Sequence, residues 1–328
     1  MVEPDTPTDA APWRRRVRAQ ALRGLTRLAG PLPTGVVRAG LSGLASLARF
    51  TRYERVVHDN LELALGAETT PNERARIAHG VRRHAARLAE EWLRLSRSGP
   101  PGTPRGAWID AAVQVDDSIE RVQAELARGR GALIVTAHLG NWELACARLA
   151  RLGLEGAVVG YRKPRDPTAR WFEDLRRTYG VTTLPQSSAA RELLQRLRRG
   201  ETLGLLADLE VRRLAGVFLP FFGVPALTMT APAGLARAHR APLLPVRCVA
   251  DPDGGPYRLS VDTPLAIDRG LPRKEATIEL TARLNAVFER WIRETPEQWS
   301  WHQRRWRTRP GEHRPMPLAA RLGAPLRG

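Results

Sequence analysis

The stretch that decides how this chain is interpreted is 137-AHLGNWELA-145, which continues the apolar run 132-ALIVTA-137. The run is short, rich in β-branched residues and bounded by glycines, so it predicts a buried strand, whereas the residues after the bend predict a helix. His138 would then lie in the turn between strand and helix, and Glu143 in the first helical turn.

This placement allows His138 and Glu143 to act together. In one continuous helix the two side chains would lie about 140° apart and could not cooperate. With Gly140 and Asn141 forming the bend, the carboxylate can fold back to the imidazole. A histidine takes a proton from a hydroxyl near neutral pH, and a bonded carboxylate fixes its tautomer. The pair therefore predicts a general base with an orienting acid; the alternative is an ordinary buried histidine at a strand end.

Three further segments have distinctive patterns: 217-VFLPFFGVPALTMTAPAGLARAHRAPLLPV-246, 296-PEQWSWHQRRWRTRP-310 and 56-VVHDNLELALG-66. Together with an H-x-x-x-x-[DE] match at His138 and Glu143, they resemble, in order and spacing, the late acyltransferases of lipid A biosynthesis. This family is part of the lysophospholipid acyltransferase superfamily. The resemblance implies a glycerolipid acyltransferase-like α/β fold, with a central, mostly parallel sheet flanked by helices.

The resemblance also implies a reaction and its partners. The activity would be O-acyl transfer from a thioester of acyl carrier protein, or of coenzyme A, to a hydroxyl of a glycolipid, with no cofactor beyond that co-substrate. The implied acceptor is a Kdo-bearing lipid A precursor, although related branches acylate other glycolipids, including mannosylated phosphatidylinositol. The implied location is the cytoplasmic face of a bacterial inner membrane.

Charge supports anionic partners. The chain of 328 residues has 52 Lys and Arg against 34 Asp and Glu, a formal charge of +18 and a pI near 11.4. Such a chain suits an anionic membrane surface, an acidic carrier protein, phosphorylated lipids or nucleic acid. No recognised nucleic-acid motif accompanies the charge, so we expect no nucleic-acid partner. No G-x-S-x-G motif supports a serine hydrolase, and two cysteines in apolar segments suggest neither a disulfide scaffold nor a metal site.

The N-terminal third differs in composition from the rest. Residues 13–50 are rich in Arg, Leu, Ala and Gly, and their charge-free runs 28–37 and 39–48 are too short to span a bilayer. We expect an interfacial anchor, the alternative being a surface helix packed on its own domain. The expected division is a disordered tail (1–12), a helical membrane-associating or cover region (13–98), a catalytic α/β domain (105–310) and a flexible basic tail (311–328).

Arginines follow a predicted second strand at 156–161. Asp166 and Pro167 form a helix start, and Arg176 and Arg177 lie later in that helix, while Arg162 lies in the loop before it. Guanidinium groups grip phosphate oxygens well. In the resembling family, arginines of this region are implicated in binding the phosphorylated acceptor or the carrier's phosphopantetheine. The alternative for each is a solvated helix face.

The segment 202-TLGLLADLE-210 predicts another buried strand, followed by Asp208 and Glu210. It resembles the family pattern L-x-P-D-Q-D, with Ala207 and Leu209 in place of proline and glutamine. A carboxylate at the carboxyl end of a parallel strand faces a ligand crevice, so Asp208 is a candidate either to bind the acceptor or to support another residue of the site. Glu210, on the second acidic position of the family pattern, is a candidate substrate-binding residue. Asp208 could instead cap nearby arginines.

The remaining candidates are aromatic or basic. Phe221 and Phe222 could line a slot for an acyl chain or simply pack in the core. Arg305 lies among the tryptophans of residues 299–306, which could form a headgroup-level belt or make cation–π contacts near the site. Residues 241–267 predict a hairpin at one edge of the sheet, and residues 71–98 and 274–295 predict long helices.

Overall fold

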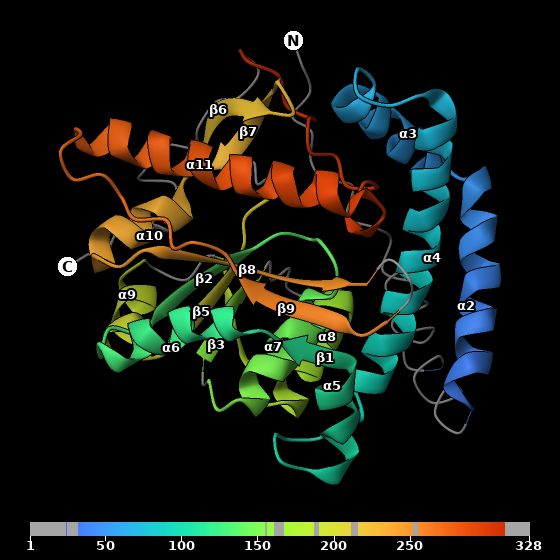
Figure 1. Cartoon of the computed structure of the whole chain (residues 1–328), viewed down its shortest axis with the longest axis horizontal. Helices are drawn as coiled ribbons and strands as arrows, with labels where there is room; N and C mark the ends of the chain where they lie inside the picture. Colours follow the sequence, from blue (N-terminus) through green and yellow to red (C-terminus); the bar gives the residue numbers. More distant parts are fainter. Residues whose placement is uncertain are drawn as a thin grey trace, which may run out of the picture.

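A computed structural model describes Gly24 and residues 32–154, 156–160, 167–186, 190–210, 216–251 and 255–311. Its centre is a seven-stranded sheet with the order β1-β9-β8-β2-β5-β3-β4 (Figure 1). Neighbouring strands are parallel except for the antiparallel pair β8 and β9. The predicted α/β class with a mostly parallel sheet is confirmed. The strands are β1 (Val113–Val115), β2 (Ala132–Thr136), β3 (Gly156–Gly160), β4 (Thr182–Pro185), β5 (Thr202–Leu206), β8 (Leu243–Ala250) and β9 (Tyr257–Val261).

Helices cover both faces of this sheet (Figure 1). Because side chains alternate along a strand, Leu133 and Val135 of β2 enter one core cluster, whereas Ala132 and Ile134 enter the other. The described helices are α2 (Thr34–Leu47), α3 (Arg52–Leu65), α4 (Pro71–Leu95), α5 (Ala107–Ala112), α6 (Glu120–Ala127), α7 (Trp142–Arg151), α8 (Pro167–Thr178), α9 (Ala190–Arg198), α10 (Ala231–His239) and α11 (Arg273–Glu294). The short 3₁₀ helices are η1 (Ala48–Phe50), η2 (Pro104–Gly106), η3 (Asp117–Ile119) and η4 (Pro296–Gln298).

The predicted hairpin at the edge of the sheet is present as β8 and β9, but it is not at the edge. Strand β1 pairs in parallel with β9, with Val113 opposite Tyr257, and takes the outer position. Three residues of β1 carry too little periodicity to be recognised as a strand in the sequence.

A separate antiparallel hairpin carries the two phenylalanines. Strands β6 (Gly216–Phe221) and β7 (Val224–Met229) are joined by Phe222 and Gly223, both with positive φ, of 53° and 71°. Two successive residues with positive φ give the turn that matches the twist of a hairpin. The pair of strands lies next to α11 (Figure 1).

The long helix predicted in the N-terminal region is confirmed as α4. It begins with a capping box, in which the Thr70 hydroxyl accepts from Glu73 N and the Glu73 carboxylate accepts from Thr70 N. Helix α2 packs along α4 at the outer side of the molecule (Figure 1). The predicted disordered tail, the basic stretch up to residue 31 except Gly24, and the predicted C-terminal tail except Gly311 lie outside the described residues. Within the described part, no helix combines the length and the apolarity needed to cross a membrane.

Candidate active site

The register of two neighbouring parallel strands brings His138 and Asp208 together. Thr136 at the end of β2 lies opposite Leu206 at the end of β5. His138 and Asp208 each follow two residues later, at the carboxyl edge of the sheet, where open α/β sheets bind ligands. His138 Nδ1 lies 2.8 Å from Asp208 Oδ1. The predicted position of His138, after the strand and before the helix, is confirmed.

Asp208 is a fully buried carboxylate with three donors. Its Oδ2 accepts from His138 N and from Trp299 Nε1, each at 2.8 Å, and its Oδ1 faces His138 Nδ1. Burial alone would raise the pKa of Asp208, but the charge of His138 and these hydrogen bonds hold it below its usual value. An ionised carboxylate only accepts, so Nδ1 carries the proton and the lone pair lies on Nε2. The imidazole is thereby prepared as a base.

The expected contact between Glu143 and His138 is absent, and this prediction is corrected. Glu143 does lie in the first turn of α7, but it is fully buried, and both oxygens bind elsewhere. Arg176 Nε donates to Oε2 at 3.0 Å and its Nη2 pairs with Oε1, while the Tyr179 hydroxyl donates to Oε2 at 2.7 Å. The acid that contacts the imidazole is Asp208, because parallel register places it there, whereas Glu143 points to α8.

The loop between β2 and α7 is clamped by backbone contacts. Gly140 has φ of +61°, and a Cβ at this position would collide with the carbonyl of Cys248. The same carbonyl accepts from Asn141 N at 2.8 Å, and the His138 carbonyl accepts from Ser300 N at 3.1 Å. Strand β8 and the segment after α11 thus hold the loop on two sides and set the position of the histidine.

Asn141 holds this loop in place through contacts within the protein, and its predicted role in binding substrate stays a prediction. It is fully buried and caps α7, since its Oδ1 accepts from Leu144 N at 3.0 Å and from Trp92 Nε1 at 3.1 Å. Its Nδ2 donates to Glu91 Oε2 at 2.8 Å, and the Tyr257 hydroxyl donates to the same oxygen. Glu91 was not recognised from the sequence, because it lies about fifty residues away on α4.

The predicted arginine cluster divides in the structure. Arg176 points inward and pairs with Glu143. Its guanidinium carbon lies 5.7 Å from the centre of the Phe172 ring. Arg177 is exposed and pairs with Asp174 at 2.7 Å. Arg162 lies outside the described residues. Arg176 therefore has an internal ionic partner, and Arg177 is the guanidinium of the pair that solvent reaches.

Glu210 and the two phenylalanines each have contacts within the protein, and their predicted roles in binding substrate stay predictions. Glu210 accepts from the backbone and the hydroxyl of Thr308, at 2.9 and 2.5 Å, and so ties down the C-terminal segment. Phe221 and Phe222 are buried, with exposures of 0 and 7%, and their rings meet at 5.1 Å. Of the two readings of this pair, packing in the core is the one observed.

Arg305 is a fully buried guanidinium next to this core. It donates to the Leu227 carbonyl and to the Thr228 hydroxyl, each at 2.7 Å, and lies 4.8 Å from the centre of the Phe221 ring. Burial lowers the pKa of Arg305 to about 10. The ring that Arg305 contacts is Phe221 and not one of the tryptophans that the sequence suggested, and the Arg305 side chain is fully buried.

Two tryptophans contact the His138 and Asp208 pair, Trp299 and Trp142, and neither was assigned to the site from the sequence. Trp299 and Trp301 are 1 and 0% exposed, so a headgroup-level belt is wrong for them. Trp299 instead donates to Asp208, and Trp142 at the start of α7 meets the His138 ring edge-on at 5.1 Å. The 296–310 pattern was the available signal for Trp299, but its target carboxylate depends on the tertiary fold.

Burial disfavours the thiolate form of both cysteines. Burial raises the pKa of Cys146 to about 12 and that of Cys248 well above its ordinary value. Among the described residues, no group of three or more His, Cys, Asp or Glu side chains could hold a metal ion. At this edge of the sheet the His138 imidazole is accessible, with its side chain 26% exposed.

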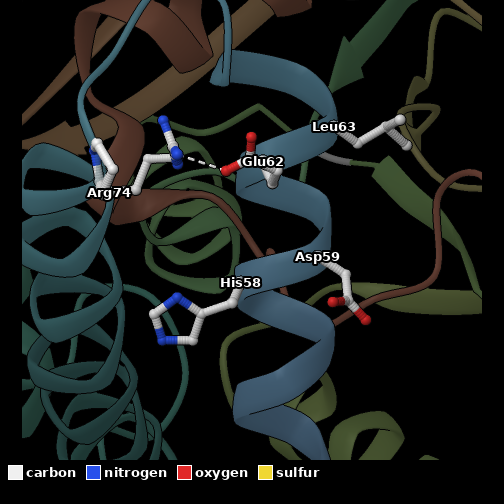
Figure 2. A pocket seen from close by; sticks show the side chains of 6 residues that line it. His58, Asp59, Glu62, Leu63 and Arg74 are labelled. Carbon is white, nitrogen blue, oxygen red and sulfur yellow. Dashed lines mark ion pairs between the residues drawn. The ribbon is translucent and has the colours of Figure 1, made fainter.

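A hollow on α3, with a volume of about 470 Å³, lies apart from this site. Its lining includes His58, Asp59, Glu62 and Arg74. Figure 2 shows Arg74 of α4 and Glu62 of α3 pointing toward one another as an ion pair. His58 and Asp59 lie on α3 with Glu62. No side chain of the His138 site lines it.

Comparison with known proteins gives a consistent family. The model of the family described as bacterial lipid A biosynthesis acyltransferase matches residues 18–308. The chain is 28% identical over 291 residues to the lipid A biosynthesis lauroyltransferase of Escherichia coli (strain K12), covering 88% of this chain and 90% of that protein. It is 26% identical over 260 residues to the palmitoleoyltransferase of the same strain, covering 79 and 80%.

A second kind of relative matches a shorter part. The phosphatidylinositol mannoside acyltransferase of Mycobacterium tuberculosis (strain ATCC 25618 / H37Rv) is 35% identical over 140 residues, which is 41% of this chain and 44% of that protein. All three names describe acyl transfer; the first two refer to lipid A biosynthesis and differ in the acyl group, and the third refers to phosphatidylinositol mannoside.

Proposed function

The chain belongs to the bacterial lipid A biosynthesis acyltransferase family and is an acyltransferase, and we propose that it transfers a fatty acyl chain from a thioester to a glycolipid hydroxyl with His138 as base. The observation that carries this proposal is the buried contact between Asp208 and His138 at the carboxyl edge of the sheet. It gives a half-buried imidazole with a free Nε2, which suits removal of a proton from an alcohol.

The proposed reaction is a direct transfer. His138 Nε2 takes the proton of the acceptor hydroxyl while the alkoxide oxygen forms a bond to the thioester carbonyl carbon. The tetrahedral intermediate then collapses, the carbon–sulfur bond breaks, and the thiolate leaves with the proton returned by the imidazolium. The Asp208 carboxylate stabilises that imidazolium through the 2.8 Å contact to Nδ1. Direct attack agrees with cysteines whose pKa values are raised by burial.

The proposed donor is acyl carrier protein, with acyl-CoA as the alternative. An acidic carrier would complement a chain of formal charge +18. The proposed acceptor is a lipid A precursor, because the match to the lauroyltransferase covers 88% of this chain. The second candidate is a phosphatidylinositol mannoside type of acceptor, which is favoured by the higher identity, 35%, of a shorter match.

The proposed location is peripheral, on the cytoplasmic face of the inner membrane. Two observations support it: the excess of basic residues, and a described N-terminal helix, α2, without any buried residue. A basic membrane- or nucleic-acid-binding protein without catalysis was the alternative of another class. It gives no reason for a buried carboxylate to orient a histidine.

The test is a transfer assay with acyl carrier protein thioesters, acyl-CoA and extracted bacterial glycolipids, with products identified by mass spectrometry. Wild type should give an acylated glycolipid, and His138→Ala should lower turnover by at least about a hundredfold, the typical contribution of a general base. His79→Ala, which removes an exposed histidine of α4, is the matched control and should be neutral. Release of free fatty acid alone would contradict the transfer reaction, and normal turnover of His138→Ala would contradict the base.

A further inference from the structure

Helix α2 has an outer face without charge. Arg38 is the one charged residue among its fourteen, and it pairs with Glu90 of α4 at 2.6 Å. A surface helix of a soluble domain ordinarily turns charged residues to solvent. Apart from Arg38, the exposed large side chains of α2 are apolar. They are Val36 (55%), Leu44 (64%) and Leu47 (60%), and at the end of the helix Phe50 (74%).

A basic cavity lies beside the N-terminal end of this helix. Its volume is about 740 Å³, and it lies between α2, the C-terminal half of α4 and η2. Glu90 is the one carboxylate of its described lining, and it is already paired with Arg38. The cavity therefore combines positive charge with apolar walls. Its arginines are Arg94, Arg97 and Arg105, and its large apolar side chains are Leu32, Val37, Leu93 and Trp108.

The arginines are placed to receive an oxyanion. The Arg94 guanidinium lies over the Trp108 ring at 4.2 Å, and Trp108 Nε1 donates to the Ser98 hydroxyl at 3.0 Å, which holds the stack in position. In the part of the chain that the structure describes, neither Arg94 nor Arg105 forms an ion pair. Such guanidinium groups bind phosphate through paired hydrogen bonds. The positive end of the α2 dipole, at Thr34, adds to the same potential.

We propose that α2 lies on a membrane surface and that this cavity binds the phosphate of an anionic lipid headgroup. Leu32 and Val37 line the cavity, and Leu32 and Val36 are exposed beside it, so an apolar surface continues from the cavity onto α2. A free phosphate would use the arginines but not that surface, whereas a phospholipid uses both. No residue of the His138 site lines the cavity, and the inference does not depend on the acyl-transfer proposal.

The test is sedimentation of the full-length protein with vesicles, without any acyl donor. Vesicles of phosphatidylcholine alone are compared with vesicles that also contain phosphatidylglycerol. Each arginine near an anionic surface contributes about fivefold to binding, so R94Q/R105Q should weaken binding to the anionic vesicles about 25-fold. R191Q/R198Q, which removes the same charge from exposed positions of α9, should change it by less than about threefold. L47S/F50S should weaken binding to both kinds of vesicle.

Three outcomes would overturn the inference. Equal losses for R94Q/R105Q and R191Q/R198Q would show that only total charge matters. Unchanged binding of L47S/F50S would remove α2 as the membrane face. If millimolar inorganic phosphate displaced the protein from the anionic vesicles, the cavity would be a site for free phosphate instead. R94Q/R105Q should retain wild-type turnover on detergent-dispersed acceptor, so a failed transfer reaction and a failed lipid site give different results.

Discussion

Replacing Asp208 by Asn tests which acid orients His138, the proposed base. The substitution keeps the size of the side chain and one oxygen for Trp299 Nε1, which donates at 2.8 Å, but it removes the charge beside His138. A hydrogen bond to a charged group contributes about 2–3 kcal/mol, so losing it lowers kcat/KM about 30- to 150-fold. The new amide can also donate to Nδ1 and move the proton to Nε2, and in related triads that wrong tautomer costs about 10⁴-fold. We expect a loss between about 30-fold, from the lost charge alone, and about 10⁴-fold, if the tautomer also changes.

Glu143→Gln is the matched comparison, because Glu143 is the acid nearer in sequence and is equally buried. It removes the charge that compensates Arg176, so we expect a loss of about 3–5 kcal/mol in the free energy of unfolding. The folded fraction should retain more activity than Asp208→Asn does.

Both variants are measured by single-turnover transfer at saturating donor and by urea unfolding. Asp208→Asn should be nearly inactive and folded, and Glu143→Gln should be less stable and more active. The opposite ranking, with Asp208→Asn close to wild type and Glu143→Gln inactive at unchanged stability, would refute the assignment of Asp208.

The remaining predictions concern stability. Burial lowers the pKa of His84, in α4, to about 4. The stability that depends on the neutral imidazole is therefore complete above pH 6.5 and is lost as the pH falls toward 4. The free energy of unfolding in urea should fall by about 2 kcal/mol from pH 7.5 to pH 5, and His84→Gln should remove this fall. Gly140→Ala should prevent accumulation of folded protein, measured by circular dichroism, because its Cβ meets a backbone carbonyl of β8. Arg176→Ala should cost about 3–5 kcal/mol in the same unfolding assay, since it leaves a buried carboxylate unpaired, whereas Arg177→Ala should cost less than about 0.5 kcal/mol.

Local patterns were sufficient for much of the fold. A continuous apolar run predicted β2, three- and four-residue periodicity predicted α4 and α11, and the bend before Trp142 was predicted between strand and helix. These features depend on neighbouring residues along the chain, which is why the sequence carries them. The edge strand β1 escaped prediction because three residues show no period, and its place beside β9 is a long-range pairing.

The candidate site divides in the same way. The sequence by itself determined that His138 follows a buried strand, that Glu143 starts a helix, and that Asp208 follows another strand. Only the tertiary structure decided that β2 and β5 are neighbours in parallel register. As a result His138 contacts Asp208, and Glu143 pairs with Arg176. The physical reason is that strand pairing and burial across the sheet determine which side chains meet. Proximity in sequence determines neither the strand pairing nor the burial.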